Sequence, residues 1–396
     1  MVLKRGDRMN DFVSDVVKNM PAYLFSELNR KKKALQEKGV DVIDLGIGAP
    51  DLPTPEFIYD VLVKEAKHPA NHRYSPYSGN QEFKEAVASF YKKHYGVELD
   101  SNTEVLTLVG TKEGIVNLIQ AVINPGDTVL IPDPGYPVYR MGVHLAGGDA
   151  VSLPLDKQNS YVPQYDALTK SEREAAKLLF LNYPSNPTAA TVELSTFTEA
   201  VDFAAKNNIL LAHDAAYDLI TFDTYKSPSV LQVPNAKDIA IEFGTLSKSY
   251  NMTGWRIGYV VGNKEIIQAL ATLKSNIDTS QFLPIQLAAA AALQSDHRTV
   301  RENSAIFKKR MEKLYNALAE MGMTAYKPKG TIFLWVDVPD GFTSAGFADK
   351  LLDELGIIVT PGTAFGPGGE GHFRISLSVS EERLDEVIKR MKNLAG

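Results

Sequence analysis

Short apolar runs alternate with helical patterns between residues 105 and 261, and this alternation constrains the fold more than any other feature of the chain. The runs occupy residues 105–108, 128–131, 178–181, 209–212, 239–243 and 257–261. Runs this short and this apolar are typical of strands that are buried on both faces of a sheet. The helical patterns between them predict helices that pack on those two faces. The sequence therefore predicts an α/β fold with a mostly parallel sheet and helices on both faces.

The alternation of short apolar runs and helical patterns ends near residue 298. A long charged amphipathic helix is followed by apolar runs at 331–336, 357–359 and 373–377, and then by a helix over 381–392. This pattern predicts a smaller α+β domain. We expect an N-terminal arm with part of the small domain in residues 1–45, a large cofactor-binding domain in 46–295 and a small C-terminal domain in 296–396.

Composition excludes several classes of function. The 396 residues carry a formal charge of −6 and no basic stripe, which argues against a nucleic-acid partner. The absence of cysteine excludes disulfides and thiolate metal sites, and no metal is expected. No apolar run approaches the ~20 residues of a membrane span, and the N-terminus lacks the pattern of a secretory signal. We expect a cytoplasmic protein with small-molecule substrates.

Lys248 lies among hydroxyls and a glycine, eight residues before an arginine, in the segment TLSKSYNMTGWR. An amine forms a Schiff base only when unprotonated, so a reactive lysine needs a pKa lowered by burial and by nearby cations. Arg256 can supply such a cation, and with Thr245 and Ser247 it can hold a phosphate. A phosphorylated aldehyde cofactor would engage both halves of the segment. The alternative is a surface lysine beside a polar turn.

Asp214 lies two residues beyond the apolar run at 209–212. A carboxylate at this place can pair with a ring nitrogen and keep it protonated, which makes a pyridine an electron sink. Tyr217, three residues further on, can reach a ring hydroxyl. The alternative for Asp214 is a helix N-cap without a ligand.

Three further motifs follow apolar runs. Asn186 lies between two prolines, and its amide can donate to the same ring oxygen, although an Asn-Pro turn without a ligand is the alternative. Gly110, Thr111 and Lys112 open a helix and offer peptide N–H groups to a phosphate. Tyr136 lies in a proline-rich turn from which its ring can stack on a flat cofactor, or else be an exposed loop aromatic.

Together these segments resemble the fold-type I pyridoxal-phosphate aminotransferases of the aspartate aminotransferase class, in the family's order and over essentially the whole chain. The resemblance implies a seven-stranded, mostly parallel sheet with a smaller α+β domain. It implies that Lys248 holds pyridoxal 5'-phosphate, that Asp214 pairs with its nitrogen, and that Asn186 and Tyr217 bind its ring oxygen. It also implies a ring stacked on Tyr136 and a phosphate surrounded by Gly110, Thr111, Lys112, Thr245, Ser247 and Arg256.

The resemblance extends to the substrate and to a partner subunit. Tyr74 matches a tyrosine that reaches across a dimer interface to the partner's phosphate, so a homodimer with shared sites is implied. Gly48 matches a glycine whose backbone meets the substrate. Arg374 matches the arginine that binds the α-carboxylate with its bidentate fork; the alternative is a strand arginine paired at the surface.

Within this class, residues 23–25 and 44–55 look like the branch that contains LL-diaminopimelate aminotransferases. That branch also contains bacterial enzymes acting on aspartate, alanine or methionine. Tyr23 matches a substrate-contacting tyrosine, with packing of the N-terminal arm as the alternative. Lys112 matches a lysine that some relatives use for a distal carboxylate, although it also occurs where substrates are neutral.

The reaction that the resemblance implies is a transamination from an L-amino acid to a 2-oxo acid, with 2-oxoglutarate as the expected acceptor. A carbon–sulfur β-lyase would share every cofactor residue but release ammonia and pyruvate from cystathionine. A regulator that uses the cofactor domain as a sensor would need a DNA-binding module, and the residues before Leu45 show no helix-turn-helix pattern.

Overall fold

The computed structural model describes residues 12–20 and 24–393, and the chain divides into two compact units, Met1–Val42 and Ile43–Gly396. In the described part of the first unit, the helices are α2 (Asp15–Lys18) and α3 (Leu24–Glu37). The Ser14 side chain accepts a hydrogen bond from the Val17 N–H and caps α2. The candidate site lies in the second unit.

A seven-stranded sheet forms the centre of the second unit, in the order β2-β8-β7-β6-β5-β3-β4. Its strands are β2 (Val105–Leu108), β3 (Thr128–Asp133), β4 (Asp149–Pro154), β5 (Ala176–Leu181), β6 (Leu210–Asp214), β7 (Ala240–Thr245) and β8 (Gly258–Gly262). The five strands at one end of this order, β7, β6, β5, β3 and β4, pair in parallel with their neighbours. Strand β8 is antiparallel to both β7 and β2. The predicted α/β class with a mostly parallel sheet is confirmed.

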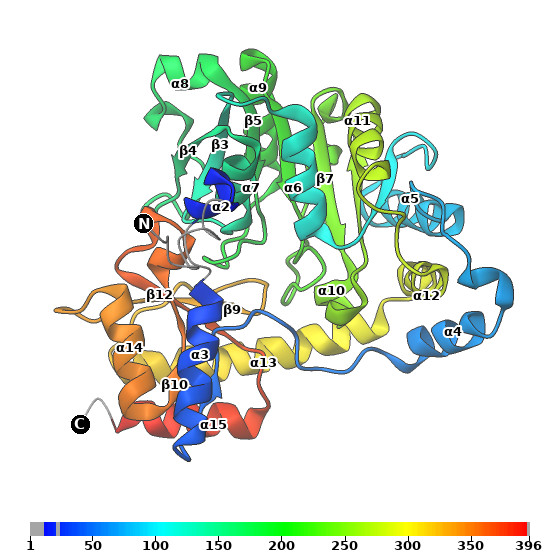
Figure 1. Ribbon diagram of the computed structural model, residues 1–396. Helices are drawn as coiled ribbons and strands as arrows, with labels where there is room; N and C mark the ends of the chain where they lie inside the picture. The colour runs from blue at the N-terminus through cyan, green and yellow to red at the C-terminus, as the bar shows by residue number, and fades with distance from the viewer. Residues whose placement is uncertain (1–11, 21–23, 394–396) are drawn as a thin grey trace, which may run out of the picture. The chain divides into compact units, whose positions relative to one another are not determined.

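The alternation of side chains along each strand builds a core on both faces of the sheet. On β5, Phe180 packs with one hydrophobic cluster and Leu179 and Leu181 pack with another, because successive side chains point to opposite faces. The first face is covered by α6 (Thr111–Val122), α7 (Val138–Ala146) and α11 (Lys264–Ser275). The second is covered by α5 (Gln81–Tyr95), α9 (Leu194–Asn207) and α12 (Leu283–Gln294). Figure 1 shows α6 in front of the sheet.

The C-terminal elements form a third hydrophobic cluster around a three-stranded antiparallel sheet of order β11-β12-β9. Its strands are β9 (Phe333–Asp337), β11 (Thr360–Pro361) and β12 (His372–Ser376), and its helices are α13 (Arg298–Glu320), α14 (Ser344–Leu355) and α15 (Glu381–Lys392). A short parallel pair joins β1 (Ile43–Asp44) to β10 (Ile357–Ile358). Tyr217, which follows β6, packs into this cluster, so the cluster adjoins the carboxyl end of the large sheet.

Shorter elements connect these layers. The remaining helices of this unit are α4 (Glu56–Ala66), α8 (Lys170–Ala175) and α10 (Leu246–Ser249). The 3-10 turns are η1 (Pro69–His72), η2 (Tyr165–Ala167), η3 (Val230–Gln232), η4 (Ala236–Asp238), η5 (Thr253–Trp255), η6 (Gly362–Phe365) and η7 (Pro367–Gly369). In the part of the chain that the structure describes, no helix is long and apolar enough to cross a bilayer.

Strand β4 and helix α14 are among the elements that were not identified from the sequence pattern. Strand β4 is the edge strand, and only Leu153 on it is fully buried, so it lacks the continuous apolar run of the central strands. Helix α14 was not identified either, although Thr343 caps it by accepting a hydrogen bond from the Gly346 N–H. The proposed division of the chain at residues 46 and 296 stays a prediction.

Candidate active site

Three neighbouring parallel strands end in polar segments that carry the predicted site residues. Asp214 is the last residue of β6, Thr245 is the last residue of β7, and Asn182 directly follows β5. Ligands of open α/β sheets bind beyond the carboxyl ends of such strands. Asn182 also ties two of these segments together, because its Nδ2 donates to the backbone oxygen of Asp214 at 2.7 Å and its Oδ1 accepts from the Asn186 N–H at 2.7 Å.

Lys248 lies on α10, immediately beyond β7. Its Nζ donates to the Gly48 carbonyl oxygen at 2.5 Å and lies 5.8 Å from the centre of the Tyr217 ring. Burial, together with the nearby charges of Arg374 and Arg256, lowers the pKa of Lys248 to about 8, and Asp214 opposes this shift. Roughly a tenth of an amine with this pKa is unprotonated at pH 7, so the side chain can act as a nucleophile or a base.

Asp214 is 3% exposed and is held by one of its two carboxylate oxygens. Oδ2 accepts a hydrogen bond from the Tyr139 hydroxyl at 2.9 Å, whereas Oδ1 is buried and has no hydrogen-bond partner among the described residues. Burial raises the pKa of Asp214, and Tyr139, His213, the Ala216 N–H and Lys248 oppose that effect. A buried acceptor without a partner is costly, so Oδ1 is suited to a donor that a ligand brings.

Arg374 is only 2% exposed and is held on several sides. Its Nη1 donates to Asn186 Oδ1 at 2.6 Å, and its Nη2 donates to the Gly46 carbonyl oxygen at 2.6 Å. The guanidinium carbon contacts two aromatic rings, 4.2 Å from the centre of Phe333 and 4.8 Å from that of Phe365. These contacts fix the planar fork before a carboxylate arrives, which is what bidentate recognition requires.

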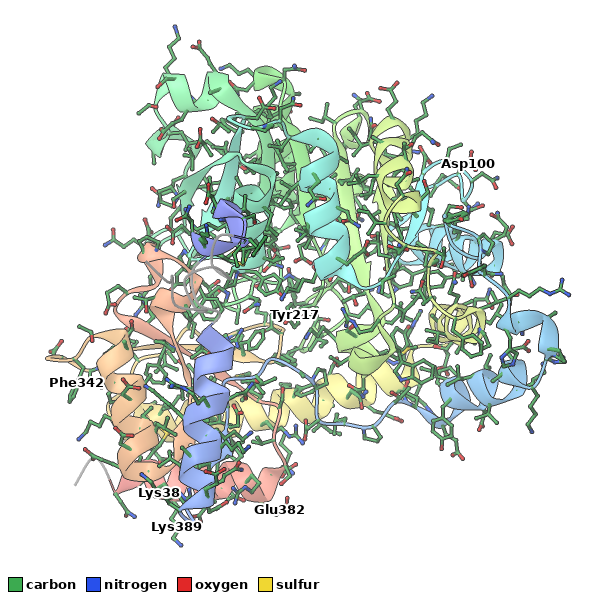
Figure 2. All side chains as sticks on the ribbon, viewed as in Figure 1. Lys38, Asp100, Tyr217, Phe342, Glu382 and Lys389 are labelled. Atoms are coloured by element: carbon green, nitrogen blue, oxygen red, sulfur yellow. The ribbon has the colours of Figure 1, made fainter. Side chains whose placement is uncertain are left out.

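Gly48 and Tyr217 both lie against Phe333. A Cβ on Gly48 would lie 2.6 Å from Cζ of Phe333, so only glycine fits there unless the ring moves. The Tyr217 ring meets the Phe333 ring edge-on, with centres 5.3 Å apart. Burial raises the pKa of Tyr217, so its hydroxyl keeps its proton and remains a donor. Figure 2 shows Tyr217 between the large sheet and the C-terminal elements.

A second group of predicted residues surrounds the N-terminus of α6. Gly110 precedes this helix with a φ of +88°, and a Cβ there would lie 2.3 Å from Arg256 Nη2, so the backbone and the guanidinium approach closely. Thr111 begins the helix, and exposed Lys112 follows it. Thr245 and Ser247 are 8% and 6% exposed. The helix N-terminus and the arginine together favour an anion.

Tyr136 and Tyr74 have other surroundings than the residues above, and the roles predicted for them stay predictions. Tyr136 is half-buried and meets the Tyr139 ring edge-on at 5.9 Å. Tyr74 is 90% exposed, and within residues 12–20 and 24–393 no ring contact or hydrogen bond places it in this chain's own site. Tyr23 lies outside the described residues.

Sequence reasoning missed four residues of this site: Tyr139, Phe333, Thr360 and Phe365. Thr360 lies with its Oγ1 3.4 Å from Arg374 Nη2 and donates to the Gly46 carbonyl oxygen at 3.1 Å. None of the four lies in a motif with a recognisable spacing, because a phenylalanine of a strand or short turn, a strand threonine and a helix tyrosine cannot be distinguished from core residues in the sequence. The nearest signal was the position of Tyr139, three residues after Tyr136.

The fold and this site define the class of enzyme to which the chain belongs. The chain belongs to the family of class I and II aminotransferases, whose model matches residues 40–391. It is a pyridoxal-phosphate-dependent enzyme that exchanges an amino group between an amino acid and a 2-oxo acid.

Individual relatives are similar over nearly their full length. The LL-diaminopimelate aminotransferase of Aquifex aeolicus is 48% identical over 381 residues, 96% of this chain and 98% of that protein. The enzyme of the same name from Moorella thermoacetica is 45% identical over 380 residues, covering 96% and 97%. The solved structure of substrate-bound BacF from Bacillus subtilis superposes with a TM-score of 0.92 at 37% identity, over 100% of this chain and 98% of that one.

The residues present fit pyridoxal phosphate. Oδ1 of Asp214 offers a buried acceptor to a protonated ring nitrogen, and Lys248 offers an amine of lowered pKa. Gly110 and Arg256 form the anion-binding end, where backbone amides and a guanidinium suit a phosphate. In residues 12–20 and 24–393, no group of three or more His, Asp or Glu side chains is arranged to hold a metal ion.

Proposed function

We propose that this enzyme transfers an amino group from LL-diaminopimelate to 2-oxoglutarate. The observation that carries the proposal is the near full-length similarity to aminotransferases named for LL-diaminopimelate, at 48% and 45% identity. The buried guanidinium of Arg374 suits the α-carboxylate that both substrates share.

The proposed roles divide between the cofactor's ring and its phosphate. Pyridoxal phosphate, when bound, supplies an electron-withdrawing ring that stabilises negative charge on the substrate's α-carbon. Asp214 holds the proton on the ring nitrogen, Asn186 and Tyr217 donate to the ring oxygen, and Tyr136 covers a ring face. The phosphate is held by residues that present N–H, hydroxyl or cationic groups: Gly110, Thr111, Lys112, Thr245, Ser247 and Arg256.

Lys248 is the proposed proton carrier. Its amine takes the proton from the substrate's α-carbon and later delivers it to the carbon that receives the amino group. A pKa of about 8 suits both steps, because the amine is a base strong enough to accept the proton and an acid strong enough to release it. Arg374 and the backbone at Gly48 hold the carboxylate, so the bond to the α-proton points toward Lys248.

We also propose a homodimer in which Tyr74 serves the partner's site. The Tyr74 side chain is 90% exposed, yet neighbouring residues of its segment are held by contacts with the rest of the chain. Ser75 Oγ donates to the Gln281 carbonyl oxygen at 2.8 Å, and Gly79 leaves no room for a Cβ beside Thr107. An aromatic ring presented to solvent on a fixed segment is suited to a contact with another chain.

A screen of the first half-reaction tests the proposed substrate. The enzyme loaded with pyridoxal phosphate is mixed with one amino acid at a time, and the change in the cofactor's absorbance is followed. We expect conversion with LL-diaminopimelate to be at least roughly tenfold more efficient than with aspartate, alanine or methionine. Faster conversion with one of those three would contradict the proposed substrate and leave the aminotransferase class intact. Pyruvate release from cystathionine without an acceptor is expected to be absent.

Mixed dimers test the proposed role of Tyr74. Protomers with Tyr74→Phe are combined with protomers with Lys248→Ala, and subunit exchange is verified by mass spectrometry of the intact dimers. If Tyr74 serves the partner, each mixed dimer holds one site with both changes and one site with neither. We therefore expect more activity per lysine-bearing subunit than in the Tyr74→Phe homodimer, most clearly at low cofactor concentration.

The comparison has a clear opposite outcome. If Tyr74 acts within its own chain, every lysine-bearing site in the mixture keeps the Tyr74→Phe defect. Activity equal to that of the Tyr74→Phe homodimer, despite complete exchange, would rule out the shared site.

A further inference from the structure

The buried hydroxyl of Tyr139 touches the carboxylate that the proposed mechanism uses. Tyr139 lies on α7 and is 1% exposed, and its hydroxyl donates to Asp214 Oδ2 at 2.9 Å. Its ring stacks on Phe180 of β5, with centres 4.8 Å apart and planes 15° from parallel. The stacking fixes the ring, so the hydroxyl is held at a defined position beside the end of β6.

The contact determines which carboxylate oxygen of Asp214 is left without a partner. The backbone oxygen of Asp214 is bound by Asn182, and Oδ2 is bound by Tyr139. Oδ1 is the buried oxygen that lacks a partner. A carboxylate held at one oxygen cannot rotate freely, and its other oxygen then has a fixed direction.

We propose that Tyr139 is a positioning residue that holds the Asp214 carboxylate with Oδ1 toward the cofactor's ring nitrogen and keeps the shared proton on that nitrogen. The inference rests on the proposed role of Asp214 and assigns to a second residue the control of that pairing.

The physical argument concerns the basicity of the carboxylate. A hydrogen bond to the charged form of a carboxylate stabilises it and makes it a weaker base. Burial raises the pKa of Asp214, and the Tyr139 hydroxyl is the largest of the effects that lower it. Without the hydroxyl, Asp214 is a stronger base and competes with the ring nitrogen for the proton.

The experiment compares two buried tyrosine–aspartate pairs in the holoenzyme. Tyr139→Phe removes the hydroxyl and keeps the stacked ring, and Tyr95→Phe is the matched control, because the Tyr95 hydroxyl donates to buried Asp218 Oδ2 at 2.7 Å. Both variants are loaded with pyridoxal phosphate labelled with 15N at the ring. The nitrogen's chemical shift and the dissociation constant of the cofactor are measured.

We expect the ring nitrogen of Tyr139→Phe to shift toward the unprotonated value and its cofactor to bind roughly tenfold more weakly. The Tyr95→Phe enzyme is expected to keep the wild-type shift and a dissociation constant within about twofold. Thermal unfolding verifies that both variants are folded. If Tyr139→Phe does not fold, Tyr139→Met, which also lacks the hydroxyl and adapts to a buried space, carries the same test.

An Asp214→Asn variant separates this inference from the proposed function. With Asp214→Asn as the background, adding Tyr139→Phe is expected to change the dissociation constant of the cofactor by less than about twofold. The reason is that Asp214→Asn has already removed the carboxylate that accepts the Tyr139 hydrogen bond. A shift in Asp214→Asn but none in Tyr139→Phe would overturn the role of Tyr139 alone. No shift in either variant would overturn the proposed role of Asp214, and the role of Tyr139 with it.

Discussion

Replacing Lys248 with alanine is expected to lower transamination by roughly 10³-fold or more while leaving a folded protein that still binds pyridoxal phosphate. The loss is large because the substitution removes the amine that carries the proton. Phosphate and ring contacts remain, so cofactor binding is retained in part. Single-turnover kinetics and equilibrium binding of the cofactor measure the two effects separately.

Lys84 provides the matched control for that variant. It is 5% exposed on α5, and burial lowers its pKa as it does for Lys248, but it does not lie at a strand end of the site. We expect Lys84→Ala to affect stability and to leave the turnover of the folded enzyme within about threefold. Near wild-type turnover in Lys248→Ala would remove the basis of the proposed mechanism.

Replacing Asp214 with alanine is expected to slow removal of the α-proton by roughly 10²-fold or more. The buried carboxylate is the group that keeps the ring nitrogen protonated, and without it the ring withdraws electrons less strongly. Asp214→Glu retains the charge and is expected to retain part of the rate. The rate of the first half-reaction, followed by the cofactor's absorbance, measures both variants.

Asp218 serves as the control for Asp214, because it is also buried and accepts a hydrogen bond from a tyrosine. The Asp218→Asn enzyme is expected to react within about threefold of the wild type once folded. If Asp214→Ala and Asp214→Glu react alike and bind the cofactor normally, Asp214 has only a structural role.

Most of the large sheet could be predicted because its central strands are buried on both faces. Residues such as Leu178 to Leu181 have nowhere polar to point, and the run is therefore visible in the sequence. Edge strand β4 has one largely open side, so polar residues such as Asp149 interrupt the pattern. The order of strands could not be read from the residues, because local patterns do not specify which strands pair.

Part of the candidate site could likewise be predicted from the sequence, and part could not. Lys248, Asp214 and Asn186 lie at or just beyond the ends of buried strands, and their positions alone indicate that they meet at one edge of the sheet. The surroundings of Arg374 depend instead on packing between distant segments, since Phe333 and Phe365 contact it only after folding. The hydrogen bond from Tyr139 to Asp214 likewise depends on how α7 packs on the sheet, 75 residues away in the chain.

The roles assigned to the site residues remain predictions, and that of Lys248 is the one on which the others depend. Only a lysine that forms a Schiff base with the cofactor becomes permanently labelled when the holoenzyme is reduced with borohydride. Trypsin does not cut at a modified lysine, so labelling of Lys248 would leave residues 238–256 as one peptide, between Lys237 and the cleavage site after Arg256.

Borohydride reduction followed by peptide mass spectrometry therefore tests the central claim most directly. We predict that the mass of the reduced cofactor is found on the peptide 238–256, with fragment ions that place it on Lys248. Labelling of another lysine, such as Lys112 at the start of α6, or the absence of any label in an enzyme that binds the cofactor, would contradict the account.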